Sequence, residues 1–396
     1  MAKKTIRNID VSNTRVLVRV DFNVPLDEQG NITDDTRIRA ALPTLDYLLE
    51  RGASLVIMSH LGRPKGQVVE SLRMGPVAGR LSQLLGTPVI KMDEVVGDEV
   101  QKASDALKPG QVLLLENLRF DPRETSNDRL FAAALARLAD IYVDDAFGAA
   151  HREHASVVGV AKLLPAVAGL LLEKEVLYLQ GLLRDPERPF VAVLGGSKIS
   201  DKLKVIDKFQ NLVDILLIGG GMIFTIMKAD GVSIGKSLVE ERLLSEVGRI
   251  MAESGGKRAT MMLPDDIVVA DEFKPEAASK VVGAESIPED WMGLDIGPET
   301  IGRYSQLIAS AKTIFWNGPM GVFEWDNFEH GTQAIAKAIA ANQGIKVAGG
   351  GDTIAAIKKY GLEDRFSHIS TGGGASMELL EGKELPGVAV LPDAEF

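Results

Sequence analysis

The chain alternates short apolar runs with segments of helical periodicity. The runs are continuous rather than alternating with polar residues, which is typical of strands buried on both faces, as in a parallel sheet covered by helices. Each run ends in a turn that is rich in polar residues or glycine. The runs are Val16–Val20, Leu55–Met58, Val112–Leu115 and Ile141–Val143 in the first half, and Val191–Leu194, Ile215–Ile218, Thr313–Trp316, Ile345–Val347 and His368–Ser370 in the second.

Helical periodicity fills the gaps between the runs. Ile335 and Ile339 lie on one helical face, for example. Between Pro165 and Pro189, four apolar residues recur at helical spacing and predict one helix that connects two lobes: Leu172, Val176, Leu179 and Leu183. The pattern therefore predicts an α/β fold of two similar-sized, doubly wound, Rossmann-like lobes with parallel sheets, joined by this helix and a hinge.

Length and composition agree with this picture and exclude some classes of protein. A chain of 396 residues suggests about two domains. The chain has no cysteine and a net charge of −11, which argues against a disulfide framework and against nucleic-acid binding. Residues 1–5 include two lysines, but the apolar segment that follows such residues in a signal peptide is not found here, and no apolar run reaches the ~18 residues of a membrane span. We therefore expect a soluble, cytoplasmic protein.

The strand ends of the first half carry arginines, and ligands of open α/β sheets bind at the carboxyl ends of strands. Several guanidinium groups arriving at one edge suit a small phosphate or carboxylate. Each of them would look the same in sequence if it were an ordinary surface arginine. The segments concerned are Asp21–Pro25, which Arg37 and Arg39 follow, Ser59–Pro64, Glu116–Phe120, and Asp144–Gly148 with its continuation to His154.

The strand ends of the second half carry glycines, which let a flat base, a ribose or phosphates approach the main chain. The most informative is Gly349–Thr353, where a strand, a glycine turn and a helix start meet. Asp352 there suits a magnesium-complexed phosphate, although a tight turn with Asp352 as an N-cap would have the same sequence. Neither a P-loop nor a dinucleotide-binding fingerprint is present. The other glycine turns are Gly195–Lys198, Gly219–Gly221, Asn317–Gly321 and Gly372–Gly374.

A lobe for a small multi-anion and a lobe for a nucleotide, joined by a hinge, predict phosphoryl transfer under closure. The segments together resemble the phosphoglycerate kinase family over essentially the whole chain, in the family's order. The segments that carry the resemblance are Asp21–Pro25, Ser59–Pro64, Gly195–Lys202, Trp316–Glu324, Gly349–Thr353 and Ser370–Ser376.

The resemblance implies a cytosolic, monomeric, glycolytic enzyme that transfers a phosphoryl group reversibly between 1,3-bisphosphoglycerate and ADP, with 3-phosphoglycerate and ATP as products. It also implies that the last residues fold back onto the first lobe. The domains would then be residues 1–172 with 375–396, which bind phosphoglycerate, and residues 173–374, which comprise the connecting helix and the nucleotide lobe.

The resemblance also implies roles for individual residues. The glycerate ligand would be held by Asp21, Asn23, His60, Arg63, Arg119 and Arg152, with Arg37 beside the transferring phosphoryl group. The nucleotide would be bound by Lys198, Lys202, Gly293, Glu324, Gly350, Gly351, Asp352 and Thr353, with Asp352 as the Mg²⁺ ligand. The phosphoryl group in flight would be contacted by Arg37, Lys198, Lys202, Gly372 and Gly373.

The chain departs from the family pattern at three positions outside these roles: Ser197, Ala149 and Glu153. The acceptor in the implied reaction is a carboxylate, which is ionised at neutral pH and therefore needs no general base. His151 and His154 resemble half a metal site but lack an obvious third ligand.

Two other classes of protein compete with this interpretation. A two-lobed solute receptor is disfavoured by the nucleotide lobe, and an NAD-dependent dehydrogenase is disfavoured by the missing fingerprint.

Overall fold

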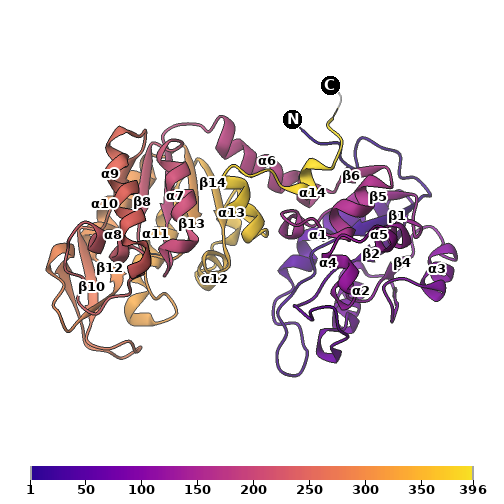
Figure 1. The fold of residues 1–396 in the computed structure, drawn as a ribbon, viewed down its shortest axis with the longest axis horizontal. Coiled ribbons are helices and arrows are strands. Elements are labelled where there is room, and N and C mark those ends of the chain that lie inside the picture. The colour runs from indigo at the N-terminus through magenta and orange to yellow at the C-terminus, as the bar shows by residue number, and fades with distance from the viewer. Residues whose placement is uncertain (1, 395–396) are drawn as a thin grey trace. The chain divides into compact units, whose positions relative to one another are not determined.

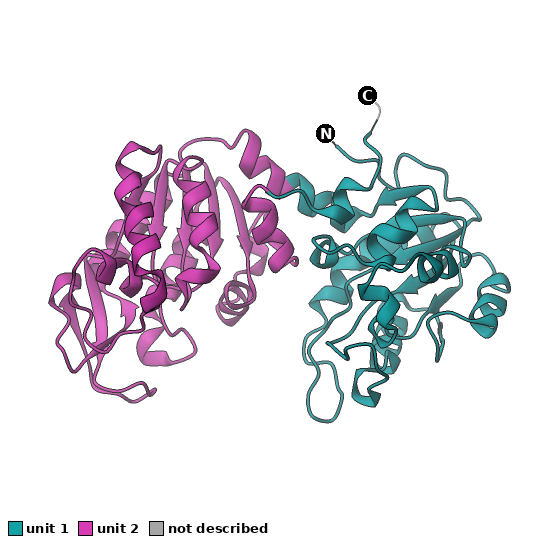
Figure 2. Cartoon of the chain, in the orientation of Figure 1, with its two compact units in different colours: residues 1–177, 383–396 teal, residues 178–382 magenta. Residues whose placement is uncertain are grey.

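The computed structural model describes residues 2–394. The chain forms two compact units, Met1–Leu177 with Lys383–Phe396, and Tyr178–Gly382 (Figures 1 and 2). Each unit contains one six-stranded sheet in which every strand pairs in parallel with its neighbours. The predicted α/β fold with two doubly wound lobes is confirmed.

The sheet of the first unit has the order β3-β4-β2-β1-β5-β6. The order reverses at the central strand, because β2 and β5 flank β1 on opposite sides. The strands are β1 (Arg15–Arg19), β2 (Ser54–Met58), β3 (Val89–Lys91), β4 (Val112–Leu114), β5 (Ile141–Asp144) and β6 (Ala166–Ala168). The α-helices are α1 (Thr36–Leu49), α2 (Gly75–Leu85), α3 (Asp98–Asp105), α4 (Pro122–Thr125), α5 (Arg129–Ala136) and α14 (Pro386–Ala389).

The sheet of the second unit has the order β15-β14-β13-β7-β8-β9 and reverses at β7, between β8 and β13. Its strands are β7 (Phe190–Leu194), β8 (Ile215–Ile218), β9 (Thr260–Met262), β13 (Thr313–Asn317), β14 (Ile345–Gly349) and β15 (His368–Ser370). The helices are α7 (Leu203–Gln210), α8 (Ile223–Ala229), α9 (Leu244–Glu253), α10 (Pro298–Ser310), α11 (His330–Ala341), α12 (Gly351–Lys359) and α13 (Gly374–Leu380).

A three-stranded antiparallel sheet also belongs to the second unit, in the order β11-β10-β12. Its strands are β10 (Asp266–Ala270), β11 (Ser279–Gly283) and β12 (Met292–Ile296). We did not predict this sheet, nor the short strands β3, β6 and β9. β11 is mostly exposed, so it lacks the continuous apolar run that identified strands of the two parallel sheets, whereas β10 has such a run at residues 267–270 and was missed.

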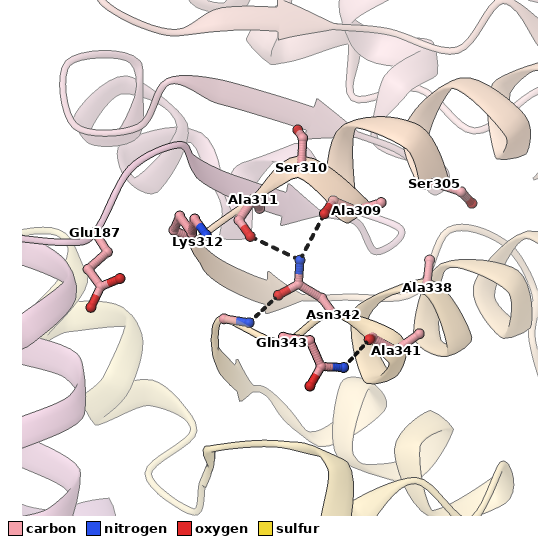
Figure 3. A pocket seen from close by; sticks show the side chains of 11 residues that line it. Glu187, Ser305, Ala309, Ser310, Ala311, Lys312, Ala338, Ala341, Asn342 and Gln343 are labelled. Carbon is pink, nitrogen blue, oxygen red and sulfur yellow. Dashed lines mark hydrogen bonds between the residues drawn. The ribbon is translucent and has the colours of Figure 1, made fainter.

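A buried, hydrogen-bonded asparagine side chain lies at the end of the second sheet where its strands begin. The amide of Asn342 donates to the carbonyls of Ile308 at 2.9 Å and Ala311 at 3.0 Å, and its oxygen accepts from the N–H of Gly344 at 2.6 Å. It thereby ties the end of α10 to the turn before β14, beside a cavity of about 440 Å³ (Figure 3).

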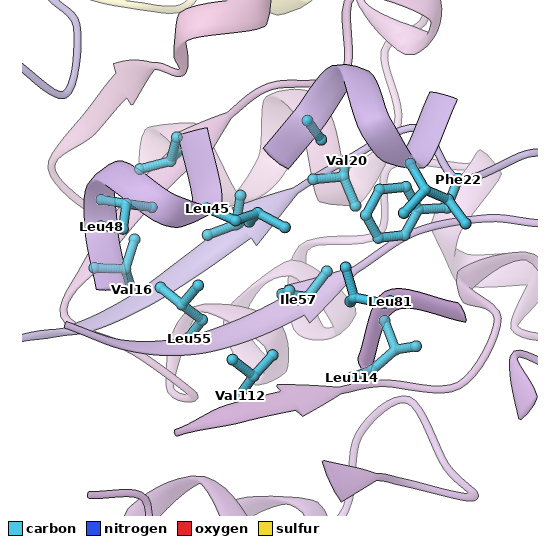
Figure 4. Packing of buried hydrophobic residues seen from close by; sticks show 14 of the residues in the cluster. Val16, Val20, Phe22, Leu45, Leu48, Leu55, Ile57, Leu81, Val112 and Leu114 are labelled. Atoms are coloured by element: carbon cyan, nitrogen blue, oxygen red, sulfur yellow. The ribbon is translucent and has the colours of Figure 1, made fainter. Parts of the chain in front are cut away.

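Apolar side chains of the predicted runs form the cores. In the first unit, β1, β2 and β4 pack against α1 and α2, and Val16, Leu45, Leu55 and Leu81 are fully buried there (Figure 4). Such burial contributes about 1.5–3 kcal/mol for each side chain. The cores thus fix the strands and hold their carboxyl ends in place.

Helix α6 (Leu170–Arg184) contains the limit between the two units. Its first amides are capped from the first unit, since Asp145 Oδ1 accepts from Leu171 N at 2.9 Å and Leu172 N at 3.2 Å, and Thr44 Oγ1 accepts from Leu170 N at 2.9 Å. The tail residues pack on the first unit, where Gly387 N donates to the carbonyl of Ala150 at 2.8 Å. Among the helices of residues 2–394, none combines the length and the apolar character needed to cross a membrane.

Candidate active site

The carboxyl ends of four adjacent strands of the first sheet, β4, β2, β1 and β5, meet at one edge. The segments that follow these strands contain the arginines and histidines that we singled out from the sequence. The edge includes the point between β1 and β5 where the strand order reverses, which is the usual ligand site of an open α/β sheet.

Asp21, Arg37 and His60 are brought together at this edge. The guanidinium of Arg37, on α1, forms an ion pair with Asp21, and Nε2 of His60 lies 3.9 Å from the Asp21 carboxylate. Burial would raise the pKa of Asp21, but His60, Arg37 and Arg19 together hold it below its ordinary value. Asp21 is therefore an anion at neutral pH and a hydrogen-bond acceptor.

Arg19 fixes the protonation of His60. Its side chain is fully buried, and Nη2 lies 3.1 Å from Nδ1 of His60. Because a guanidinium only donates, Nδ1 must accept, and the proton of the neutral ring is on Nε2. Burial also lowers the pKa of His60 well below its usual value, against the charge of Asp21. The site thus presents His60 as a neutral N–H donor.

Arg119 and Arg152 extend the cationic cluster. Burial and the charges of Arg152 and Arg19 lower the pKa of Arg119 to about 10, so it stays charged at neutral pH. Arg119 also donates to the carbonyl of Gly62 at 2.8 Å. Arg152 donates to His151 at 3.1 Å. Arg63 lies in the same loop as Gly62 but is exposed.

Sequence reasoning missed the buried groups behind the cluster. Nε of Arg19 donates to Ser156 Oγ at 2.9 Å, and Ser156 donates in turn to Glu124 at 2.6 Å. Burial lowers the pKa of His154 to about 4, and its Nδ1 lies 3.6 Å from Glu124. The available signal was Arg19 itself, a charged residue inside an apolar run, which must find polar partners when it is buried.

In the second unit, the glycine turns also meet where the strand order reverses. The amide of Gly195 after β7 donates to the carbonyl of Asn317 at the end of β13, 2.9 Å away. Lys202 donates to Oδ1 of the Asn317 side chain, and Nδ2 of the same side chain donates to the carbonyl of Gly349 at 2.7 Å. Thr353 Oγ1 accepts from Gly318 N at 2.7 Å. Lys202 is thereby held between the turns after β13 and β14.

A cavity of about 480 Å³ lies beside these turns, within the range of small-molecule sites. Gly293, Glu324 and Asp352 line it, together with four further glycines: Gly196, Gly220, Gly221 and Gly321. A side chain at Gly293 would place its Cβ 2.0 Å from the ring of Phe224. Several of the predicted glycine turns thus line one cavity.

The start of α12 combines a glycine turn with one exposed carboxylate. Gly350 has φ of 97° and directly precedes the helix, and Asp352 lies in the first turn. The Asp352 carboxylate is exposed, and its charge acts on Lys202. One exposed carboxylate beside a phosphate site fits Mg²⁺, which is commonly held by one or two carboxylates and the substrate's phosphates. Within residues 2–394, no group of three or more acidic or histidine side chains is arranged to bind a metal without such a substrate.

The remaining predicted residues lie on neighbouring turns. Lys198 is exposed after β7. Gly373 has φ of 51° and directly precedes α13, whereas the amide of Gly372 donates to Ser370 Oγ at 3.2 Å. Asn23 accepts from the amide of Gly62 at 2.8 Å. The three residues that depart from the family pattern differ in exposure: Ala149 is buried, whereas Ser197 and Glu153 are exposed.

Comparison with known proteins agrees with this geometry. The family model described as phosphoglycerate kinase matches residues 6–383. A phosphoglycerate kinase of Moorella thermoacetica is 57% identical over 396 residues, which cover 99% of this chain and 100% of the relative. One of Herpetosiphon aurantiacus is 56% identical over 393 residues, with 99% and 100% coverage.

Solved structures agree as well. The structure of phosphoglycerate kinase from Coxiella burnetii matches with a TM-score of 0.89 at 41% identity, over 98% of each chain. That from Pyrococcus horikoshii OT3 matches with a TM-score of 0.85 at 32% identity, again over 98% of each chain. The chain therefore belongs to the phosphoglycerate kinase family and is a phosphotransferase of glycolysis.

Proposed function

We propose that the chain transfers a phosphoryl group reversibly and in line from 1,3-bisphosphoglycerate to ADP, giving 3-phosphoglycerate and ATP. The observation that carries this proposal is the cluster of Asp21, Arg37, His60, Arg119 and Arg152 at one sheet edge. It offers fixed cations and N–H donors to a small multi-anion and has one carboxylate, Asp21, for a substrate hydroxyl.

In the first unit, Asp21, Asn23, His60, Arg63, Arg119 and Arg152 bind the glycerate ligand. Arg37 is the cation assigned to the phosphoryl group in flight, since its ion pair with Asp21 holds its side chain at the edge of the site. Neutral His60 donates from Nε2, because Arg19 engages its other nitrogen.

In the second unit, Gly293 and Glu324 border the adenosine in the cavity beside Asp352. The phosphates are contacted by Lys198, Lys202 and the turn that leads into α12, with Gly350, Gly351 and Thr353. Gly372 and Gly373 offer main-chain N–H groups to the phosphoryl group, and Gly372 must exchange its bond to Ser370 to do so. Asp352 binds Mg²⁺, which supplies charge neutralisation of the nucleotide phosphates when it is bound.

The transfer uses no general base, because the acceptor is already a carboxylate at neutral pH. Catalysis then depends on positioning, on cations and N–H donors, and on exclusion of water. We propose that closure about the hinge at α6 brings both ligands together and excludes water. We also propose that the protein is a cytoplasmic monomer whose partners are these small molecules, without nucleic acid or membrane.

The experiment that tests this function supplies 3-phosphoglycerate as the only acceptor with Mg-ATP and follows ADP release in a coupled assay. We expect turnover that requires both 3-phosphoglycerate and Mg²⁺. ADP release that is independent of the acceptor, or equal turnover with glycerol, which has a hydroxyl but no carboxylate, would contradict the proposal.

A further inference from the structure

Asn117 is a fully buried polar side chain behind the cationic cluster, and no role has yet been given to it. It lies three residues after the end of β4, just before the 3₁₀ turn Leu118–Phe120, which contains Arg119. A primary amide has two donor hydrogens and two acceptor lone pairs, and Asn117 uses all four.

The four hydrogen bonds link the turn that contains Arg119 to Leu61 and to Leu72. Oδ1 accepts from the amide of Arg119 at 3.1 Å and from the amide of Leu61 at 3.1 Å. Nδ2 donates to the carbonyl of Leu61 at 2.7 Å and to the carbonyl of Leu72 at 3.0 Å. Asn117 therefore holds both main-chain groups of Leu61, the residue between His60 and Gly62, and orients Arg119 at the same time.

The loop held in this way contacts the other binding segments. Gly62 N donates to Asn23 Oδ1 at 2.8 Å, and the carbonyl of Gly62 accepts from the guanidinium of Arg119 at 2.8 Å. Ser59 Oγ accepts from Phe22 N at 2.8 Å, and the Ser59 carbonyl accepts from Leu118 N at 3.1 Å. The positions of His60, Asn23 and Arg119 thus depend on one loop, and Asn117 fixes that loop at its centre.

We infer that Asn117 is a positioning residue for phosphoglycerate binding, which acts through His60, Asn23 and Arg119 without touching the substrate. The inference rests on the proposed function. No other side chain of similar size provides two donors and two acceptors in one plane, so replacement leaves buried main-chain groups without partners. Loss of such partners loosens the loop and reduces the preorganisation of the binding groups.

The test compares Asn117→Ser with Asn342→Ser. Asn342 is the matched control, because it is a buried asparagine with donor and acceptor bonds to main chain (Figure 3). It precedes β14, where the strands of the second sheet begin, and it does not line the cavity of the candidate nucleotide site. We expect Asn117→Ser to raise the KM for 3-phosphoglycerate about tenfold, since a buried group without a partner costs about 1–3 kcal/mol. The KM for ATP and kcat should change less than about threefold. Asn342→Ser should lower the thermal midpoint and leave both KM values unchanged.

Asn117→Asp provides a second readout. The new carboxyl is isosteric, but when ionised it places an oxygen against the carbonyls of Leu61 and Leu72. Burial raises the pKa of such a carboxyl, and its protonated form regains one donor. We expect the KM for 3-phosphoglycerate of this variant, relative to the unmodified protein, to fall as the pH is lowered.

Three outcomes would overturn the inference. The first two are an unchanged KM for 3-phosphoglycerate in Asn117→Ser and an equal rise in both KM values. The third is loss of the folded state in both Asn117 variants, which would show that Asn117 serves only the stability of the fold. Absence of turnover in the unmodified protein would instead refute the proposed function. The two failures are therefore observed separately.

Discussion

Arg19 shows how single side chains set the chemistry of this site. A charged residue in the centre of a parallel sheet is costly unless its donors find acceptors. Arg19 finds Ser156, the carbonyl of Val20 and Nδ1 of His60. The buried charge therefore decides which nitrogen of His60 carries the proton, and it lowers the pKa of both Asp21 and His60.

Arg37→Ala should reduce kcat by about 10²–10³-fold, if its charge acts on the phosphoryl group mainly in the transition state. The KM for 3-phosphoglycerate should change little. Steady-state kinetics in both substrates measure the two effects. Arg39→Ala is the control, since Arg39 lies two residues further along α1 and pairs with Asp35 at the surface. A change confined to KM would show that Arg37 acts in ground-state binding.

If Asp352 binds the metal as proposed, Asp352→Asn should raise the KM for Mg-ATP about tenfold or more, because it removes a charged ligand from the start of α12. The KM for 3-phosphoglycerate should stay within about twofold. Titrating Mg²⁺ at fixed ATP separates a metal effect from a phosphate effect. Asp230→Asn, at the exposed end of α8, is the control. An equal loss of affinity for both substrates would refute the assignment of this residue to the nucleotide.

At the scale of elements, the sequence predicted strands of the two parallel sheets whose residues form continuous apolar runs, but it missed β10, which has such a run at residues 267–270. It did not predict β11, whose residues are mostly exposed, or β3, in which no residue is fully buried. The arginines and the glycine turns were visible because they follow the strands. Arg19, Glu124 and Asn117 were not, because their partners come from distant segments that only the fold brings together.

Helix α6 depends on a buried carboxylate whose protonation should be visible in stability. Burial raises the pKa of Asp145 to about 7, although the amides of the helix and Thr44 oppose this, and an unfolded aspartate has a pKa of about 3.9. Between these values the folded state keeps a proton that the unfolded state releases. This group therefore makes the free energy of unfolding fall as pH rises from about 4 to about 7, with no further loss above that range.

Asp145→Asn should remove this slope. Asp145 Oδ2 makes no hydrogen bond, and Oδ1 accepts from α6, so the amide can keep the cap. We expect the thermal midpoint of the variant, relative to the unmodified protein, to rise between about pH 5 and about pH 8. The thermal midpoint of Asp230→Asn should depend on pH in parallel with that of the unmodified protein. A parallel profile for Asp145→Asn would show that Asp145 has no raised pKa.

At the scale of the whole molecule, an acidic protein binds acidic substrates. The net charge is −11, from 44 basic and 55 acidic residues, yet Arg19, Arg37, Arg119 and Arg152 act on the same few groups at one sheet edge. The Debye length is about 10 Å at 0.1 M salt, so more distant acidic residues are screened, whereas cations in contact with a ligand are screened less. The local cluster should therefore outweigh the net charge.

Salt should weaken the binding of 3-phosphoglycerate. If the cluster binds 3-phosphoglycerate, raising KCl from about 20 mM to about 200 mM should raise its KM several-fold, because salt weakens the attraction between opposite charges. Arg152→Gln should raise the KM at low salt and reduce its dependence on salt, since one interacting charge is lost. Arg39→Gln should leave the slope unchanged, because Arg39 pairs with Asp35 at the surface. If the KM fell as salt increased, long-range repulsion by the acidic surface would dominate, and the cluster could not be the principal attraction for the substrate.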